Sequence, residues 1–283
     1  MEKGYYRAAW NDIKNSPGWF GKLCLLALIE CIPIFGLIVN YGYQITWARE
    51  IAWDLNRPMP AKIFGNEDGK LYRRGWFALV IGLVMAIVPC IIYALAVAAN
   101  GGVADNWNLL SAILMVVYVL SLFAFGLAAL VGCMRMTIYD SLSAGLGFKQ
   151  IWKMMKHDAN GMFRILGMQL LLMLIFGAIF CVITFVVVFF VFVAAGAASA
   201  AAIGSGGAHM GFFEMGFFSL LTFAAPVMIA IAYFCMVANV FIEMVTMRAA
   251  GYWTRNFQVN QWGDKDAPLP FEVQQRESAS QAH

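Results

Sequence analysis

Five long apolar stretches constrain this chain more than any other feature. A helix that spans a bilayer needs roughly 20 consecutive apolar residues. The stretches cover residues 19–43, 76–99, 109–133, 165–193 and 212–240. Apolar residues make up 62% of the chain and charged residues only 12%, whereas a soluble domain has about 25% charged residues. We therefore expect an all-α, polytopic helical membrane protein.

The Lys and Arg residues indicate which ends of the stretches face the cytoplasm, because cytoplasmic segments are enriched in both residue types. All 19 of them lie in four groups, within residues 3–22, 49–74, 135–164 and 248–276. The connections 100–108 and 194–211 contain none. The last four stretches therefore alternate cleanly across the membrane, as four spans with both termini in the cytoplasm.

The first stretch breaks this alternation, since basic residues flank it on both sides. We expect residues 19–43 to form a re-entrant helical hairpin that turns at Pro33 to Gly36 and returns to the cytoplasmic side. Proline removes a backbone donor and disfavours helix at the preceding residue, and glycine allows the turn. Such backbone must be covered by protein or water. The alternative is a fifth span with an external N-terminus.

Two segments have the apolar spacing of helices that lie on a membrane surface. In residues 1–18 the apolar side chains at helical spacing are Tyr6, Ala9, Trp10 and Ile13. In residues 144–157 they are Phe148, Ile151, Trp152 and Met155, beside a basic stripe of Lys149, Lys153 and Lys156. The second pattern predicts contact with anionic lipid at the cytoplasmic face. It does not favour nucleic acid, because the helix is tethered between spans.

The chain therefore reads as one helical membrane domain over residues 1–262. Residues 263–283 are polar and contain Pro268 and Pro270. We expect them to form a disordered cytoplasmic tail.

Glu30 is the most unusual residue of the first stretch, because an ionisable side chain in an apolar run is costly and is a functional candidate by default. It would serve a proton or cation relay if it faced water or a partner. The alternative is a neutral or hydrogen-bonded Glu30 with a structural role, since no intramembrane Lys or Arg is visible as its partner. Other polar residues near the span ends could line a path or bond across helices. The full candidate set, with the two turn residues of the hairpin, is Glu30, Pro33, Gly36, Asn40, Gln169, Asn239 and Glu243.

No sequence motif points to catalysis, a cofactor or a metal. The six cysteines lie in or at the end of apolar segments without a C-x-x-C pair, and the three histidines are far apart. Phosphate-binding, zinc-protease and serine-hydrolase motifs are missing from the sequence. We expect no catalytic, cofactor-binding or metal site, and we interpret the cysteines as small apolar side chains.

Several residues of the N-terminal third together resemble a known family. They are Pro17, Trp19, Leu23 to Leu28, Pro33 to Gly36, Gly42, Tyr43, Pro58, Pro60 and Gly75. On these residues the chain resembles a prokaryotic membrane family catalogued as domain of unknown function 4013. The resemblance implies a multi-span protein of a prokaryotic cell (inner) membrane and supplies no activity. The chain departs from the family pattern at Ala61 to Phe64, where Trp and acidic residues usually follow the proline segment.

Three functions follow from these patterns, in decreasing order of support. The lack of catalytic motifs and the surface helices favour a non-enzymatic scaffold or an accessory subunit that binds an unidentified membrane protein. The hairpin and Glu30 favour a transporter or channel-like component. A lipid-modifying enzyme has the least support, because no nucleophile or metal cluster is visible.

Overall fold

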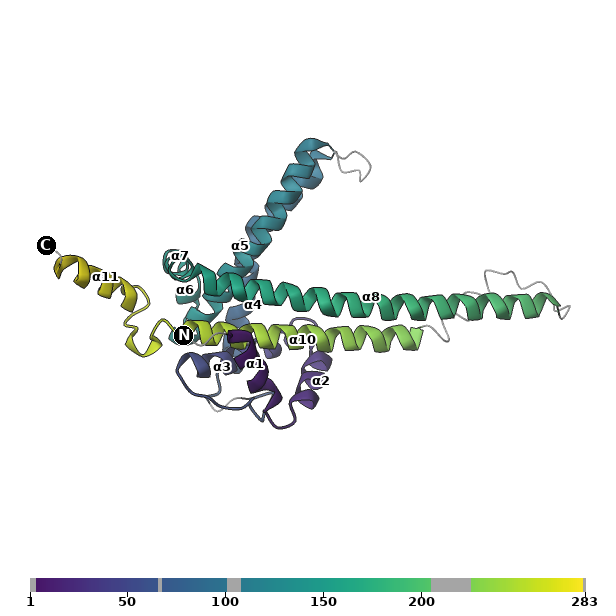
Figure 1. The fold of residues 1–283 in the computed structure, drawn as a ribbon, viewed down its shortest axis with the longest axis horizontal. Coiled ribbons are helices and arrows are strands. Elements are labelled where there is room, and N and C mark those ends of the chain that lie inside the picture. Colours follow the sequence, from purple (N-terminus) through teal and green to yellow (C-terminus); the bar gives the residue numbers. More distant parts are fainter. Residues whose placement is uncertain (1–3, 66–67, 101–107, 205–224, 282–283) are drawn as a thin grey trace. The chain divides into compact units, whose positions relative to one another are not determined.

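The computed structural model describes residues 4–65, 68–100, 108–204 and 225–281, and in these residues every regular element is helical (Figure 1). The helices of the first half are α1 (Tyr5–Lys14), α2 (Trp19–Glu30), α3 (Phe35–Ala52), α4 (Leu71–Ala99) and α5 (Leu109–Tyr139). Those of the second half are α6 (Leu142–Gly145), α7 (Phe148–His157), α8 (Ala159–Gly204), α10 (Ala225–Arg255), the 3₁₀ helix η2 (Val259–Gln261) and α11 (Pro270–Gln281).

Four helices in the described residues are long and apolar enough to cross a membrane: α4, α5, the first 32 residues of α8, and α10. They confirm the expected polytopic helical membrane protein. Their bounds differ from the apolar stretches, because a helix continues past the bilayer for as long as its backbone bonds do. The stretch 212–240 falls partly on residues 212–224, which lie outside the described residues, and α10 extends beyond it to Arg255.

The first stretch is broken into α2 and α3, with 12 and 18 residues. α2 is about 18 Å long, well short of a bilayer core. Between them Pro33, Ile34 and Phe35 form a γ-turn in which the Phe35 amide donates to the Pro33 carbonyl over 2.6 Å. Ile34 has φ 63° and ψ −56°, a rare and strained conformation for a β-branched residue. The side chains from Cys31 to Phe35 are exposed.

Gly36 acts differently from the sequence-based expectation. It lies in the first turn of α3, and its φ is not positive. A Cβ atom at Gly36 would lie 2.2 Å from the Ile29 carbonyl oxygen. Glycine is therefore needed for the close approach of α2 and α3, and the γ-turn itself falls on Pro33 and Ile34.

The described chain groups into two compact units. Unit 1 comprises residues 1–168 and 243–283, and unit 2 comprises residues 169–242. In unit 2, the parts of α8 and α10 meet through Phe176 and Phe241, whose rings are 6.1 Å apart. Most side chains of unit 2 that point outward are apolar, as a lipid environment requires.

Helix α3 is the centre of unit 1. Every residue from Gly42 to Ala48 is buried, so this segment is surrounded on all sides. A Cβ atom at Gly75 would lie 1.9 Å from the Ile38 carbonyl oxygen, and one at Gly251 would lie 2.4 Å from that of Ala48. The backbones of α4 and α10 therefore contact the backbone of α3 directly.

Both terminal segments of unit 1 contain a helix that packs on protein through buried residues. The tail expected to be disordered contains α11, and Leu269 before it is buried. Tyr6, Ala9 and Ile13 on the apolar face of α1 pack against protein. Its Tyr6 is buried with its hydroxyl 2.7 Å from Thr246 Oγ1 of α10, and of its apolar residues only Trp10 stays exposed.

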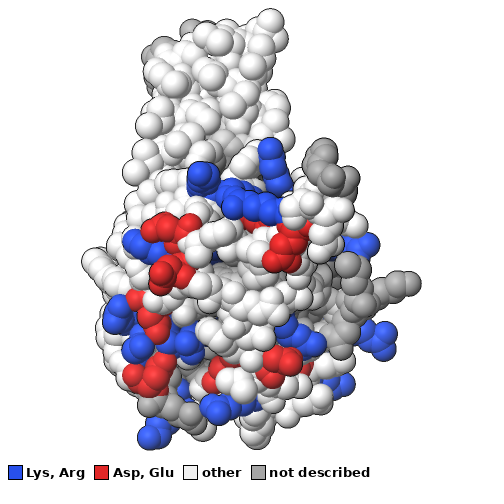
Figure 2. Space-filling model, turned by 90° about the vertical axis from the view of Figure 1, so that its left-hand side faces the viewer, with Lys and Arg blue, Asp and Glu red and all other residues white. Residues whose placement is uncertain are grey.

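Charged side chains gather away from the apolar ends of α4 and α5. Figure 2 shows Lys, Arg, Asp and Glu spread over the face it presents, below an upper projection without such residues. That projection is the far end of α4 and α5 (Figure 1), which have no charged residue between Trp76 and Ala99 or between Leu109 and Met134. The charged part of unit 1 is the end predicted to face the cytoplasm.

Candidate functional site

Three of the seven candidate residues meet in one chain of hydrogen bonds inside unit 1. Asn40 Nδ2 donates to Glu30 Oε2 over 3.3 Å. Gln44 Nε2 donates to Asn40 Oδ1 over 2.8 Å and to Glu243 Oε2 over 3.4 Å. Two carboxylates, from α2 and α10, are thus bridged by two amides from α3. We call Glu30, Asn40, Gln44 and Glu243 the polar chain.

The side chains in the middle of the polar chain are buried, whereas the side chain at its α2 end is partly exposed. Asn40 is 1% exposed and Gln44 is 0% exposed, whereas Glu30 is half-buried. The two amides stand one helical turn apart on α3, and this spacing places them on one face. Among the buried side-chain atoms without a hydrogen-bond partner is Gln44 Oε1.

Partial burial raises the pKa of the Glu30 carboxyl above its usual value, because a charged group loses hydration there. Burial, and after it the negative charges of Glu243 and Glu30, raise the pKa of the neighbouring Tyr41 to about 12. Tyr41 is therefore a neutral phenol at physiological pH.

The remaining candidate residues lie elsewhere. Pro33 and Gly36 shape the hairpin. Gln169 and Asn239 belong to unit 2, where Gln169 is half-buried and Asn239 is exposed. Gln44 completes the polar chain and was missed by the sequence analysis. Its spacing of i, i+4 from Asn40 on an otherwise apolar helix face could have revealed it.

Three arginines at the charged end of unit 1 are each at most 1% exposed, namely Arg74, Arg135 and Arg248. Burying a cation is costly unless it is paired and hydrogen-bonded. Each of these arginines joins a helix end to a segment far away in the sequence. The sequence analysis placed them among cytoplasmic charges and did not predict their burial. The signal was available for two of them, since Arg135 and Arg248 are isolated cations within runs of apolar residues.

Arg74 joins the start of α4 to the end of α5. Its Nε donates to Asp140 Oδ1 over 2.8 Å, its Nη2 lies 2.7 Å from Asp68 Oδ2, and its Nη1 bonds Thr46 Oγ1 over 3.3 Å. Asp140 also accepts from Lys70 over 2.9 Å. Partial burial raises the pKa of Asp140, but the bonds from Arg74 and Lys70 outweigh it and hold that pKa below its usual value.

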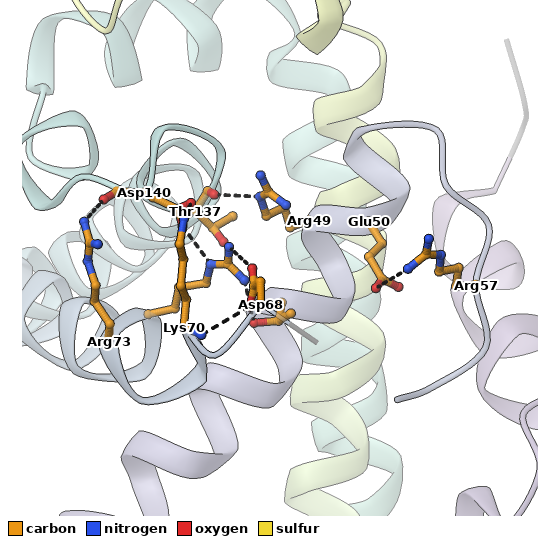
Figure 3. Close-up of polar contacts among 10 residues, drawn as sticks. Arg49, Glu50, Arg57, Asp68, Lys70, Arg73, Thr137 and Asp140 are labelled. Atoms are coloured by element: carbon orange, nitrogen blue, oxygen red, sulfur yellow. Dashed lines mark hydrogen bonds and ion pairs between the residues drawn. The ribbon is translucent and has the colours of Figure 1, made fainter. Parts of the chain in front are cut away.

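The same cluster neutralises the end of α5. Arg73 Nη2 donates to the Asp140 carbonyl over 2.6 Å and Arg49 Nε to the Thr137 carbonyl over 2.9 Å (Figure 3). The last carbonyls of a helix lack partners within the helix and carry partial negative charge, so cations are stabilising there.

Arg248 joins α10 to α1, to α3 and, through a bond of 3.3 Å from Nη2 to Asn56 Oδ1, to the segment after α3. It bonds Asp12 Oδ2 through Nε over 2.8 Å and the Trp47 carbonyl through Nη1 over 2.7 Å. Its guanidinium lies 4.3 Å from the centre of the Trp47 ring, a cation–π contact. Tyr252 donates to the same Asp12 oxygen over 2.9 Å.

Arg135 joins α5 to the C-terminal segment. Its Nη2 donates to the Lys265 carbonyl over 2.9 Å. Its guanidinium lies 5.5 Å from the ring centres of both Tyr139 and Trp262, and these two rings stack. Together the three arginines tie α1, the segment after α3 and the C-terminal segment to the helix ends. We call this assembly the arginine platform.

A pocket of ≈ 420 Å³ opens between the end of α7, the turn after α10 and α11. His157 and Phe271 stack in it with ring centres 4.0 Å apart. Four amide side chains also line it, together with Phe257, Pro270 and Ser278; the amides are Asn256, Gln258, Gln274 and Gln275. This surface mixes aromatic and neutral polar groups, as protein interfaces do.

Some apolar residues of helix α7 are buried in protein and others are exposed. Ile151 and Met154 are buried, whereas Phe148 and Trp152 are exposed. Lys156 lies over the Trp152 ring at 5.2 Å, while Lys153 pairs with Glu272 of α11. The exposed aromatic pair with its neighbouring lysines is a pattern typical of a membrane interface.

Within the described part of the chain, no group of three or more His, Cys, Asp or Glu residues is arranged to hold a metal ion. A family model described as "Protein of unknown function (DUF4013)" matches residues 25–184, which is more than half of the chain. No curated protein and no solved structure matches.

Proposed function

The chain belongs to the family of proteins of unknown function DUF4013, and from its own residues we propose its function. It is a non-enzymatic scaffold or accessory subunit of a complex in a prokaryotic cell (inner) membrane. The observation that carries this proposal is the arginine platform. Each of its three arginines is at most 1% exposed, and together they connect separate segments at the charged end of unit 1. A surface built this way is preorganised, so a partner binds without ordering it first.

Both termini face the cytoplasm in this proposal, and anionic lipid contacts α7 through Phe148, Trp152 and Lys149. Each lysine near such a surface adds about 1 kcal/mol of attraction. The α2–α3 hairpin enters the membrane from the cytoplasmic side, with the exposed apolar residues Ile32, Ile34 and Phe35 toward lipid.

The pocket beside α11 is the proposed contact surface for the membrane-protein partner. The test is purification of the tagged chain from native membranes in lipid nanodiscs, with the mass of the particle measured. We expect a hetero-oligomer for the wild type and its loss on Gln274→Arg, which places a charge in the pocket. Ser280→Arg on the same helix lies outside the pocket and should retain the complex. A wild-type chain recovered alone would contradict the proposal.

Topology is tested by labelling. Single cysteines at Asn15 and at Ser280, both exposed, are placed in a chain without native cysteines. An impermeant thiol reagent added to intact cells should label neither. Labelling at Asn15 alone would mean that the first stretch crosses the membrane and that five spans are present.

A second function, a transporter or channel-like component, is favoured by the polar chain, because carboxylates bridged by buried amides are typical of ion and proton pathways. Its test is cation or proton flux into proteoliposomes. Wild-type flux should fall to the level of empty liposomes on Glu30→Gln, and flux that is the same with and without protein would exclude this function.

A further inference from the structure

The hydrogen bonds of the polar chain leave one buried acceptor, the Gln44 carbonyl oxygen, without a donor. Both amide groups donate: Asn40 to Glu30, and Gln44 to Asn40 and to Glu243. The Gln44 carbonyl oxygen accepts from nothing, although its side chain is 0% exposed. The opposite amide orientation would aim that oxygen at the Glu243 carboxylate, so the hydrogen bonds fix the orientation.

The Glu30 carboxylate lies at the other end of the two bridging amides. Among the described residues, Glu30 forms no ion pair, and burial alone accounts for the raised pKa of its carboxyl group. Glu30 and Glu243 both contribute negative charge at the neighbouring Tyr41. A buried acceptor without a donor, next to acidic groups, is unfavourable unless a positive species shares the site.

We propose that the polar chain binds one small monovalent cation, Na⁺ or a proton, between the Gln44 carbonyl oxygen and the carboxylates of Glu30 and Glu243. Carbonyl and carboxylate oxygens are the ligands that hard cations prefer. A proton would sit on one carboxyl group and be donated to Gln44 Oε1. The half-buried Glu30 is the entrance, and Gln44 and Glu243 are the inner end.

This inference goes beyond the scaffold function and deepens the transporter function. It is tested by binding and not by flux, so the two fail separately. A protein that binds the cation and gives no flux refutes transport only. A protein that gives flux without the cation-dependent effect described below refutes this inference only.

The experiment measures the Tm of the purified full-length protein in detergent, in NaCl and in choline chloride at equal ionic strength, at several pH values. A ligand that binds the folded state raises Tm in proportion to the logarithm of its concentration once the site saturates. For Na⁺ we expect a rise of a few degrees in NaCl over choline chloride. For a proton we expect the rise on lowering the pH, with no difference between the two salts.

The variants Gln44→Leu and Glu30→Gln should each abolish the rise. Glu30 is partly exposed and glutamine has the shape of glutamate, so Glu30→Gln should fold normally. It therefore tests the site even if Gln44→Leu fails to fold. The matched control is Asn100→Ala, which removes another buried amide with an unpartnered oxygen, at the far end of α4. Its response should equal that of the wild type. A wild-type Tm indifferent to both Na⁺ and pH, or a rise that survives both variants, would overturn the proposal.

Discussion

Helix α10 belongs to both units, and its two parts bury their side chains in opposite ways. In unit 2, Ile229 and Phe234 are exposed and apolar, whereas in unit 1 Met244, Arg248 and Trp253 are fully buried. Lipid tails solvate an apolar side chain as well as a protein interior does, so unit 2 needs few internal contacts. A buried arginine has no such substitute and depends on named protein partners. Unit 1 should therefore be sensitive to single polar changes, and unit 2 should not.

The largest expected effect comes from breaking the Arg248 cluster. Asp12→Asn leaves a buried guanidinium without its carboxylate, which should lower the free energy of unfolding by about 3 kcal/mol. Unfolding in mixed detergent and SDS micelles measures this. The double variant Asp12→Asn/Arg248→Met removes both charges and should recover part of the loss. An unchanged stability of Asp12→Asn would mean that the ion pair is not structural.

The contact between α3 and α4 gives the next effect. Gly75→Ala puts a Cβ atom against the Ile38 carbonyl, and we expect a loss of about 2–3 kcal/mol. Gly82→Ala on the same helix meets nothing within 4 Å and should be neutral or slightly stabilising, since alanine favours helix. The same unfolding assay compares them. Equal effects of the two variants would contradict the direct backbone contact.

The pH dependence of unit 1 should include Asp140. Its pKa is lower in the folded state than the ordinary value of 3.8, so its contribution is present above that value. It is lost as the pH falls through the lower, folded pKa. Asp140→Asn should therefore cost on the order of 1 kcal/mol at pH 7, and the difference from wild type should shrink in acid below about pH 4. A difference that does not depend on pH would show that the charge is unimportant.

Relieving the strain of the γ-turn at Ile34 should give a small gain in stability. Ile34→Gly relieves a positive φ at a β-branched residue and should raise the free energy of unfolding by about 0.5–1 kcal/mol, after the entropy cost of glycine. Ile32→Gly changes a residue of the same loop whose φ is not positive, so it should lower stability. If both variants destabilise equally, the conformation of Ile34 is not a source of strain.

The smallest effect is expected in unit 2. Phe185 on α8 is 71% exposed, and Phe185→Leu exchanges one lipid-facing apolar residue for another. We expect a change within about 0.5 kcal/mol in the unfolding assay. A loss as large as that of Asp12→Asn would mean that this face of α8 contacts protein.

The apolar pattern alone predicted the helical class and the four spans, because a bilayer leaves few alternatives to a long apolar helix. The break of the first stretch at Pro33 was predictable for the same kind of reason, since proline has no amide hydrogen. The role of Gly36 was not, because a glycine serves a turn or a close approach depending on what packs against it. The burial of Tyr6, Ala9 and Ile13 of α1 in protein was not predictable for a related reason: an amphipathic pattern fits a protein surface as well as a membrane.

The polar chain separates what the sequence could predict from what it could not. The sequence marked Glu30, Asn40 and Glu243 as unusual, one by one, because polar groups in apolar runs stand out. It could not join residues 30 and 243, and it overlooked Gln44, since the geometry between α2, α3 and α10 is not encoded in local spacing. What the chain determined by itself was its solvent and its helices, through hydrophobicity. Which arginines are buried, and which amides bridge which carboxylates, was decided by packing, because those contacts join segments up to 236 positions apart.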